Sequence, residues 1–175
     1  MKLFILILIF ISAQSFASQY DFIIMRHARA PGTGDPSHFK LGDCKTQRNL
    51  SADGIQQAKQ LGKTLPKKLK VYSSQWCRCL DTARNLNRGE VVELPLLNSF
   101  YQDRGLENDQ TKKLKNWINQ ELKNKHLFIL VTHQVNITAL LDVFPAEGQL
   151  IFVKKKDSGA LEVVKTPEIS IDLTR

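Results

Sequence analysis

The sequence predicts an α/β domain in which a mostly parallel central sheet is flanked by helices on both faces. Short apolar segments without helical periodicity alternate with amphipathic segments over most of the chain, which favours a parallel sheet covered by helices. The 175 residues are 42% hydrophobic and 24% charged, and the nine glycines and six prolines show no period. This composition excludes wholesale disorder and a collagen-like or low-complexity fibre.

Residues 1–17 have the pattern of a secretory signal peptide. Lys2 precedes the apolar run 3–11, and the small residues Ser15 and Ala17 come before the expected cleavage point. The apolar run is about half of the roughly 20 residues that span a bilayer, so no stable membrane span is expected. Residues 18–175 then form one domain, and a periplasmic or secreted location follows. The alternative, a buried N-terminal strand, is disfavoured because residues 20–25 already resemble the first strand.

The first half of this domain begins with a short apolar strand at residues 20–25. The stretch 29–49 is polar and rich in turn-forming residues, and irregular segments of this length inside a compact domain are usually functional. Ser51 can cap a helix whose apolar face ends before Pro66. A second strand is expected at residues 70–73, followed by a helix over 76–86.

The second half repeats this alternation. A third strand is expected at residues 91–94, an irregular stretch at 95–108, and a helix capped by Asp109. Residues 127–131 form the clearest buried strand and lead into a helix over 135–143. Residues 149–153 and 161–164 are expected to pair as a hairpin that turns at 156–159.

Four polar residues follow the predicted parallel strands: Arg26, His27, Arg78 and His133. Ligands in such sheets bind beyond the carboxyl ends of the strands. Arginine presents a planar fork of donors that suits phosphate oxygens, and a neutral imidazole can attack phosphorus. Each residue alone would more often be a surface or capping group. Together they predict a phosphoryl-transfer pocket that needs neither a metal nor an organic cofactor.

Four segments in order along the chain resemble motifs of the histidine phosphatase superfamily. They are FIIMRHA at residues 22–28, RNLSADGIQQA at 48–58, YSSQWCRCLDTA at 72–83 and VTH at 131–133. The resemblance implies the fold of the phosphoglycerate-mutase-like branch. It also implies that His27 is a nucleophile that becomes phosphorylated, while Arg26, Arg78 and His133 surround the transferred group.

The chain departs from the family pattern in three places. Ala28 and Gln134 stand where glycines are usual, which is tolerable if neither position needs a positive φ. Ser99 stands where family members that act on ordinary phosphate esters usually carry a glutamate, and Gln134 also excludes the His-Asp pair of the phytase-like branch. We therefore expect Asp103 to supply the missing general acid, although an ion pair with Arg104 is equally compatible with its position. Glu107, Asp35 or the substrate itself are the alternatives.

Three cysteines, Cys44, Cys77 and Cys79, enter an oxidising compartment if the chain is exported. One disulfide and one free thiol is the simplest arrangement, with Cys44 joined to one of the other two. The family resemblance favours Cys77, because Cys79 occupies the small inward position usually held by alanine. Three reduced cysteines, or a zinc site using His38 or His126, are weaker alternatives.

A net charge of +8 favours anionic partners, but the lysine clusters carry few interleaved aromatics. We interpret them as solvated surfaces and expect no nucleic-acid partner. The loop APGTGDP at residues 30–36 resembles an exported subgroup proposed to remove phosphate from lipopolysaccharide core heptose. This implies a small phosphorylated substrate, such as a phosphosugar of the cell envelope. A phosphohistidine-protein phosphatase and a catalytically silent phosphate- or polyanion-binding module are the alternatives.

Overall fold

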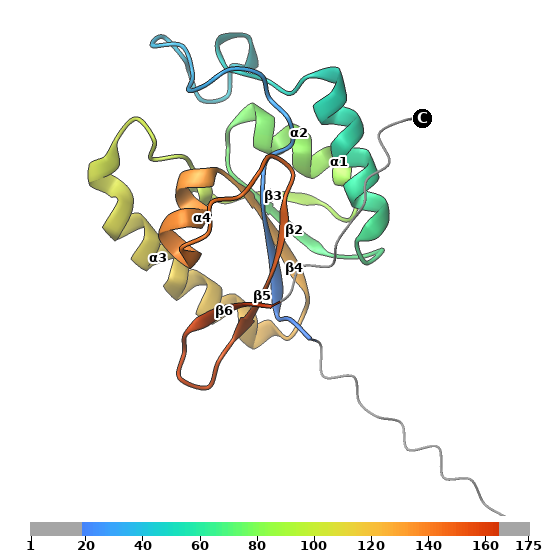
Figure 1. Ribbon diagram of the computed structural model, residues 1–175, viewed down its shortest axis with the longest axis vertical. Helices are drawn as coiled ribbons and strands as arrows, with labels where there is room; N and C mark the ends of the chain where they lie inside the picture. Colours follow the sequence, from blue (N-terminus) through green and yellow to red (C-terminus); the bar gives the residue numbers. More distant parts are fainter. Residues whose placement is uncertain (1–18, 165–175) are drawn as a thin grey trace, which may run out of the picture.

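The computed structural model describes residues 19–164, and the predicted signal peptide lies outside these residues. Six strands form one sheet in the order β3-β2-β4-β1-β5-β6 (Figure 1). Their bounds are β1 Phe22–Arg26, β2 Lys70–Ser73, β3 Val91–Glu93, β4 Phe128–Thr132, β5 Leu150–Lys155 and β6 Leu161–Val164. The first four strands are mutually parallel, whereas β5 and β6 pair antiparallel at one side. The predicted fold class is confirmed.

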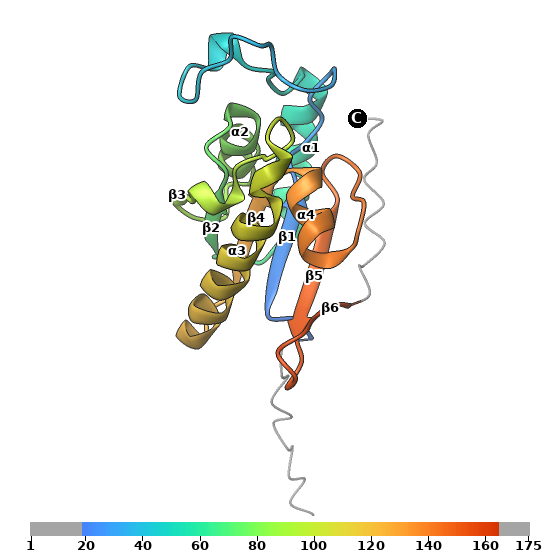
Figure 2. The same ribbon diagram turned by 90° about the vertical axis from the view of Figure 1, so that its left-hand side faces the viewer.

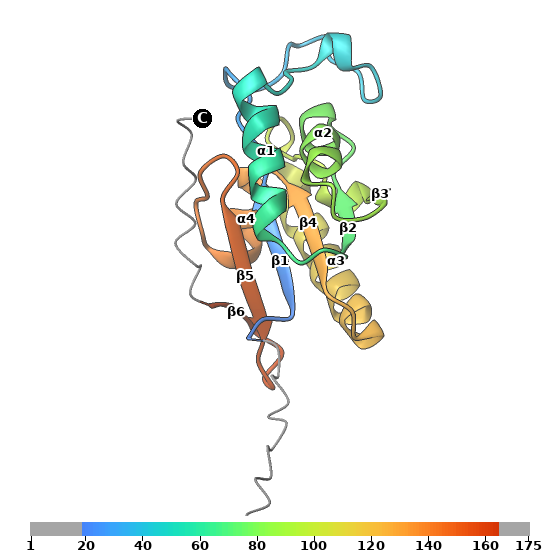
Figure 3. The same ribbon diagram turned by 90° about the vertical axis from the view of Figure 1, so that its right-hand side faces the viewer.

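Four helices cover the two faces of this sheet (Figures 2 and 3). They are α1 Ala52–Thr64, α2 Cys77–Leu86, α3 Glu107–Glu121 and α4 Gln134–Leu141. Along β1, Ile23 and Met25 pack with α1 and α2, whereas Phe22 and Ile24 pack with α3 and α4. Because β1 is buried on both faces, it is a continuous apolar run and does not alternate.

The N-termini of α1 and α3 show how side-chain caps determine where these helices begin. Ser51 caps α1, and its side chain accepts a hydrogen bond of 3.0 Å from the amide of Gly54. The predicted cap of α3 at Asp109 is wrong, since the helix begins at Glu107. The reason is that Asp103 caps a short 3₁₀ turn, Arg104–Leu106, which runs directly into α3.

Close backbone contacts at two glycines fix α1 beside the site. A Cβ on Gly54 would lie 2.1 Å from the carbonyl oxygen of Arg29, and a Cβ on Gly62 would lie 2.1 Å from that of Leu86 in α2. Neither position can carry a larger side chain without moving the backbone. Helix α1 therefore holds the start of the loop that follows β1.

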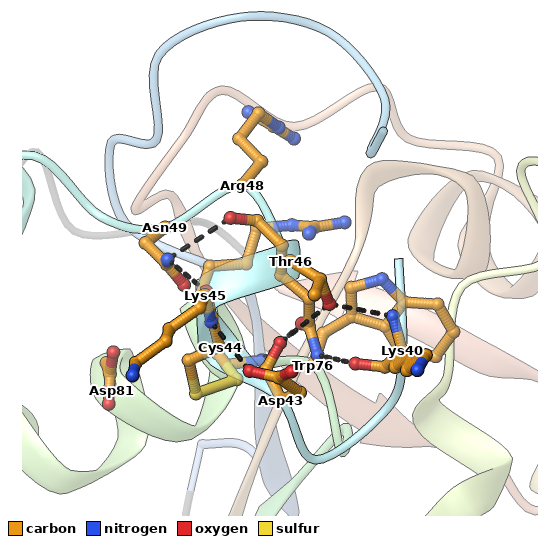
Figure 4. Close-up of a disulfide and its surroundings, with 12 residues drawn as sticks. Lys40, Asp43, Cys44, Lys45, Thr46, Arg48, Asn49, Trp76 and Asp81 are labelled. Carbon is orange, nitrogen blue, oxygen red and sulfur yellow. Dashed lines mark hydrogen bonds between the residues drawn. A yellow bond between two sulfur atoms is a disulfide. The ribbon is translucent and has the colours of Figure 1, made fainter. Parts of the chain in front are cut away.

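Residues 29–49 form an irregular loop beyond the carboxyl ends of the parallel strands, at the top of Figure 1. Gly32, Gly34 and Gly42 have positive φ angles of 89°, 70° and 83°. A disulfide between Cys44 and Cys77 ties the loop to the first residue of α2, as Figure 4 shows. The predicted pairing is therefore present. Between residues 19 and 164, no helix has the length and apolar character needed to cross a membrane.

Candidate active site

A pocket opens where the carboxyl ends of β1, β2 and β4 meet. Parallel pairing sets Arg26 of β1 opposite Thr132 of β4, so the residues that follow, His27 and His133, become neighbours. Their ring centroids are 5.7 Å apart. The cavity has a volume of about 130 Å³. Its walls are formed by Arg26, His27, Gly32, Thr33, Gly34, Asp35, Arg48, Trp76, Arg78, Ser99, Tyr101, Gln102, His133, Gln134 and Val135.

His27 is held as a neutral imidazole with one nitrogen available. Its Nδ1 lies 2.8 Å from the carbonyl oxygen of Ala28. A carbonyl only accepts, so Nδ1 carries the proton and the lone pair is on Nε2. Burial lowers the pKa of His27 to about 3, and the neighbouring guanidinium groups of Arg78, Arg48 and Arg26 also lower it, against the bond to Ala28. The unprotonated nitrogen that nucleophilic attack requires is thus present at neutral pH.

His133 belongs to a directed chain of hydrogen bonds. Arg78 Nη2 donates to His133 Nδ1 over 3.3 Å, and an arginine cannot accept in return. The proton of this imidazole is therefore on Nε2, which donates to the hydroxyl of Ser74 at 2.9 Å. That hydroxyl donates onward to the side-chain oxygen of Asn98 at 3.2 Å. Burial, followed by the charge of Arg78, keeps the pKa of His133 well below its usual value.

Arg78 is buried at the start of α2 and meets a carboxylate from the loop. Its Nη1 lies 2.9 Å and 3.0 Å from the two side-chain oxygens of Asp35. Only 4% of the Arg78 side chain and 5% of the Asp35 side chain are exposed. The Nε of Arg78 has no hydrogen-bond partner among residues 19–164. A buried donor without an acceptor is costly, so this arginine suits an anionic ligand.

Arg48 shapes the loop from within. Its guanidinium donates to the carbonyl oxygens of Gly34 and Gly32, each at 3.0 Å, and to that of Ala30. Its backbone amide donates to Asp35 over 3.0 Å. The carbonyls of three alternate residues thus turn toward one cation, and this is possible because both glycines adopt a positive φ.

Arg26 completes a set of three guanidinium groups around the cavity. It donates to the carbonyl oxygen of Pro145 over 3.2 Å and lies 3.7 Å from Glu147. The same Glu147 oxygen lies 3.9 Å from Arg48. Two carboxylates, Asp35 and Glu147, therefore partly offset three positive charges, and the remaining excess attracts an anion such as a phosphoryl group.

The two glycine replacements in the family pattern fit the backbone. The non-glycine residues with positive φ between residues 19 and 164 are Asn87, Lys125 and Asp142. Neither Ala28 nor Gln134 is among them, so neither needs the freedom of glycine. The amide of Ala28 donates to the hydroxyl of Thr82 at 2.9 Å, which anchors the residue after His27 to α2.

The structure brings Arg26, His27, Arg78 and His133 together, but it does not bring Asp103 to the pocket. The carboxylate of Asp103 accepts a hydrogen bond of 3.2 Å from the amide of Gly105 as the cap of the 3₁₀ turn. Its neighbour in sequence, Gln102, reaches the wall of the cavity, and so does Ser99. The position of Asp103 gives no support to its predicted role as general acid.

Sequence reasoning missed Arg48 and Ser74, and it considered Asp35 only as an alternative general acid. In the sequence, Asp35 and Arg48 belong to the irregular loop, and Ser74 belongs to a motif in which only Arg78 has a predicted catalytic role. A signal existed for Arg48, since it opens the second family-like segment, whereas nothing local connects Asp35 to Arg78, 43 residues away. In the described part of the chain, no three His, Cys, Asp or Glu side chains gather in a way that would hold a metal ion.

Fold and pocket together define an α/β protein with a histidine- and arginine-lined anion pocket at the carboxyl edge of its sheet. Residues 22–100, slightly less than half of the chain, match the model of the histidine phosphatase superfamily (branch 1). The matched segment contains three of the four family-like motifs, those at residues 22–28, 48–58 and 72–83. A search among curated proteins found no sequence match.

Solved structures of phosphatases share the fold. A phosphoserine phosphatase mutant from Entamoeba histolytica is 15% identical, with a TM-score of 0.58 over 82% of this chain and 94% of that one. The protein histidine phosphatase SixA, complexed with tungstate, is also 15% identical, with a TM-score of 0.56 over the same shares. A mycobacterial glucosyl-3-phosphoglycerate phosphatase in complex with VO3 is 14% identical, with a TM-score of 0.60 over 81% and 96%.

Proposed function

We propose that this protein is a phosphatase that hydrolyses a phosphomonoester through a phosphohistidine at His27. The observation that carries the proposal is the state of His27: neutral, oriented through Nδ1, and surrounded by three arginines. A neutral imidazole beside guanidinium groups attracts a phosphate dianion and can attack it.

The reaction takes two displacements. In the first, Nε2 of His27 forms a bond to phosphorus while the bond from phosphorus to the ester oxygen breaks, and the leaving oxygen takes up a proton from solvent. In the second, the oxygen of a water molecule bonds to phosphorus while the bond from phosphorus to Nε2 breaks. Water gives up a proton to solvent in this step, and inorganic phosphate is released. Arg26 and Arg78 supply the positive charge that a metal ion supplies in other phosphatases, because charge builds on the phosphoryl oxygens in both transition states.

The substrate we propose is a small phosphosugar of the cell envelope, reached by an exported enzyme in the periplasm or outside the cell. The signal-peptide pattern of residues 1–17 and the disulfide both support this location. Four of the residues that line the pocket, Thr33, Tyr101, Gln102 and Gln134, have polar side chains and support a polar, uncharged group beside the phosphate.

One observation favours two other candidates. The carboxylate in the pocket wall, Asp35, accepts hydrogen bonds from surrounding donors, so the pocket shows no ready proton donor for a leaving alkoxide. A phosphohistidine-protein phosphatase needs less help from an acid, because the leaving imidazole is a better leaving group than an alkoxide. A silent phosphate-binding module needs no acid at all.

A substrate panel with the mature protein separates these candidates. The panel contains p-nitrophenyl phosphate, sugar phosphates and a phosphohistidine peptide, with His27→Ala as the inactive reference. We expect turnover of sugar phosphates, an alkali-stable and acid-labile phosphoenzyme that His27→Ala lacks, and no effect of chelators. A dependence on divalent ions contradicts the mechanism, and phosphate binding without turnover establishes the silent module.

A further inference from the structure

The loop carboxylate of Asp35, which lies outside the family-like segments, accepts four hydrogen bonds in the pocket. Its Oδ1 accepts from Arg78 Nη1 at 2.9 Å and from the amide of Arg48 at 3.0 Å. Its Oδ2 accepts from Arg78 Nη1 at 3.0 Å and from the indole Nε1 of Trp76 at 3.1 Å. Each oxygen therefore meets two N–H donors, and the carboxylate is almost fully buried.

This environment excludes a role as proton donor. A proton on either oxygen of Asp35 would point toward an N–H group of Arg78, Arg48 or Trp76, none of which can accept it. The carboxylate is instead held as an acceptor in a fixed orientation. The residue it fixes most directly is Arg78, because both of its oxygens contact the same guanidinium nitrogen.

Orientation matters for Arg78 because its side chain is long and its donors point in set directions. With Nη1 committed to Asp35 and one hydrogen of Nη2 to His133, the donors left over are Nε–H and the second hydrogen of Nη2. These are the hydrogens through which Arg78 can grip a phosphoryl group beside His27. Because the carboxylate of Asp35 holds Nη1, it sets the direction in which these remaining hydrogens of Arg78 point.

We propose that Asp35 is a positioning residue of the reaction, which sets the orientation of Arg78 toward the phosphoryl group. The proposal rests on the proposed function. It also explains why the loop 29–49 is fastened beside the pocket. Arg48 and the Cys44–Cys77 disulfide keep this loop at the site, and Asp35 is the point at which the loop meets the catalytic groups.

The test is Asp35→Asn, which keeps one acceptor oxygen and the size of the side chain but removes the charge. We expect kcat to fall about 10- to 100-fold, equally for p-nitrophenyl phosphate and for a sugar phosphate, because Asp35 acts through Arg78 and not on the leaving group. Binding of orthovanadate, which mimics the five-coordinate phosphorus, should weaken by a similar factor. Asp43→Asn, an exposed carboxylate in the same loop, is the matched control and should leave both unchanged.

A double-mutant cycle separates positioning from a general structural role. On an Arg78→Ala background, Asp35→Asn should cost little further, because a residue that acts through Arg78 has nothing left to orient. If Asp35→Asn unfolds the protein, Trp76→Phe removes one of the two donors to Oδ2, together with part of a buried ring that packs against Phe39 and His133. It should lower kcat several-fold, and the melting temperature measured alongside shows how much of the loss comes from packing.

Four outcomes overturn the proposal. Tighter vanadate binding by Asp35→Asn would show that the carboxylate competes with the ligand for Arg78. A loss confined to the sugar phosphate would make Asp35 the general acid, and a loss that persists without Arg78 would make it structural. Unchanged kcat and vanadate binding would leave it no role. If the wild-type protein turns over no substrate, the proposed function fails by itself, and vanadate binding measured by calorimetry still tests Asp35.

Discussion

Single side chains in this pocket have their chemical states fixed by the groups that face them. The proton of His27 is on Nδ1 because a carbonyl oxygen faces it, and the proton of His133 is on Nε2 because Arg78 faces its other nitrogen. The two neutral histidines are therefore opposite tautomers. Only one of the two, His27, leaves its unprotonated nitrogen without a described donor.

The first prediction at this scale concerns Asp103. Because its carboxylate caps a 3₁₀ turn and does not line the pocket, Asp103→Asn should change turnover of both a sugar phosphate and p-nitrophenyl phosphate by less than about twofold, since asparagine caps equally well. Steady-state rates with both substrates measure this. A selective loss of about 10² on the sugar phosphate would instead show that the segment moves Asp103 into the site as its acid.

The residues that carry chemistry were predictable in part. Arg26, His27, Arg78 and His133 follow strands or lie in motifs, so a linear pattern was enough to find them. The contacts of Asp35 and Arg48 were not predictable, because they depend on how a loop with glycines at positive φ folds over the sheet. No local periodicity encodes such a conformation, and its partners are set only by the assembled fold.

At the scale of elements, the loop 29–49 and helix α2 act as one unit. They are joined by the Cys44–Cys77 disulfide, by the amide of Cys77, which donates to the side chain of Gln47 at 3.0 Å, and by the contact of Arg78 with Asp35. Figure 4 shows the loop side of this junction, where Lys45 extends toward Asp81 of α2.

Element boundaries were less predictable than element types, as the early start of α3 shows, because a 3₁₀ turn and a helix share the same local signals.

The second prediction follows from this junction. The disulfide closes a loop with a sequence separation of 33, so Cys44→Ser should lower the free energy of unfolding by about 3 to 4 kcal/mol in the chain-entropy model. Urea unfolding of the oxidised wild type and the variant measures it. The loop should also lose its fixed position over Arg78, so vanadate binding should weaken.

Thiol counting provides the control for that experiment. The oxidised wild type should show no alkylatable thiol when folded, one when unfolded without reductant, and three after reduction, because the free Cys79 is fully buried. Three alkylatable thiols before reduction would contradict the bond.

On the scale of the whole molecule, stability depends on two buried histidines, His27 and His133, that stay neutral in the folded protein. In the unfolded chain a histidine takes up a proton below about pH 6.5, whereas in the folded protein the pKa of His27 is about 3. Between these values the unfolded state binds more protons, so stability must fall as the pH falls. The arginines that make the pocket attractive to anions contribute to this cost.

The third prediction is therefore a pH dependence of stability. The advantage of the wild type over His27→Asn in free energy of unfolding should shrink by about 2 kcal/mol between pH 6.5 and pH 4.5, with a slope that approaches about 1.4 kcal/mol per pH unit for one group. Urea titrations at the two values measure this. His38→Asn, at an exposed loop position, is the reference substitution for the same measurement. A constant difference between wild type and His27→Asn would mean that folding does not lower the pKa of His27.

The spacing of Cys77 and Cys79 along α2 has a consequence for how the protein reaches its native state. Residues two apart on a helix point about 200° away from each other, so the turn that aims Cys77 at the loop also turns Cys79 into the core beside His133. Burial raises the pKa of the Cys79 thiol to about 12, which keeps it from acting as a thiolate. In a chain that oxidises before α2 has packed, both thiols compete for Cys44. Packing of α2 before oxidation removes this competition, because Cys79 is then buried in the core and Cys77 faces Cys44.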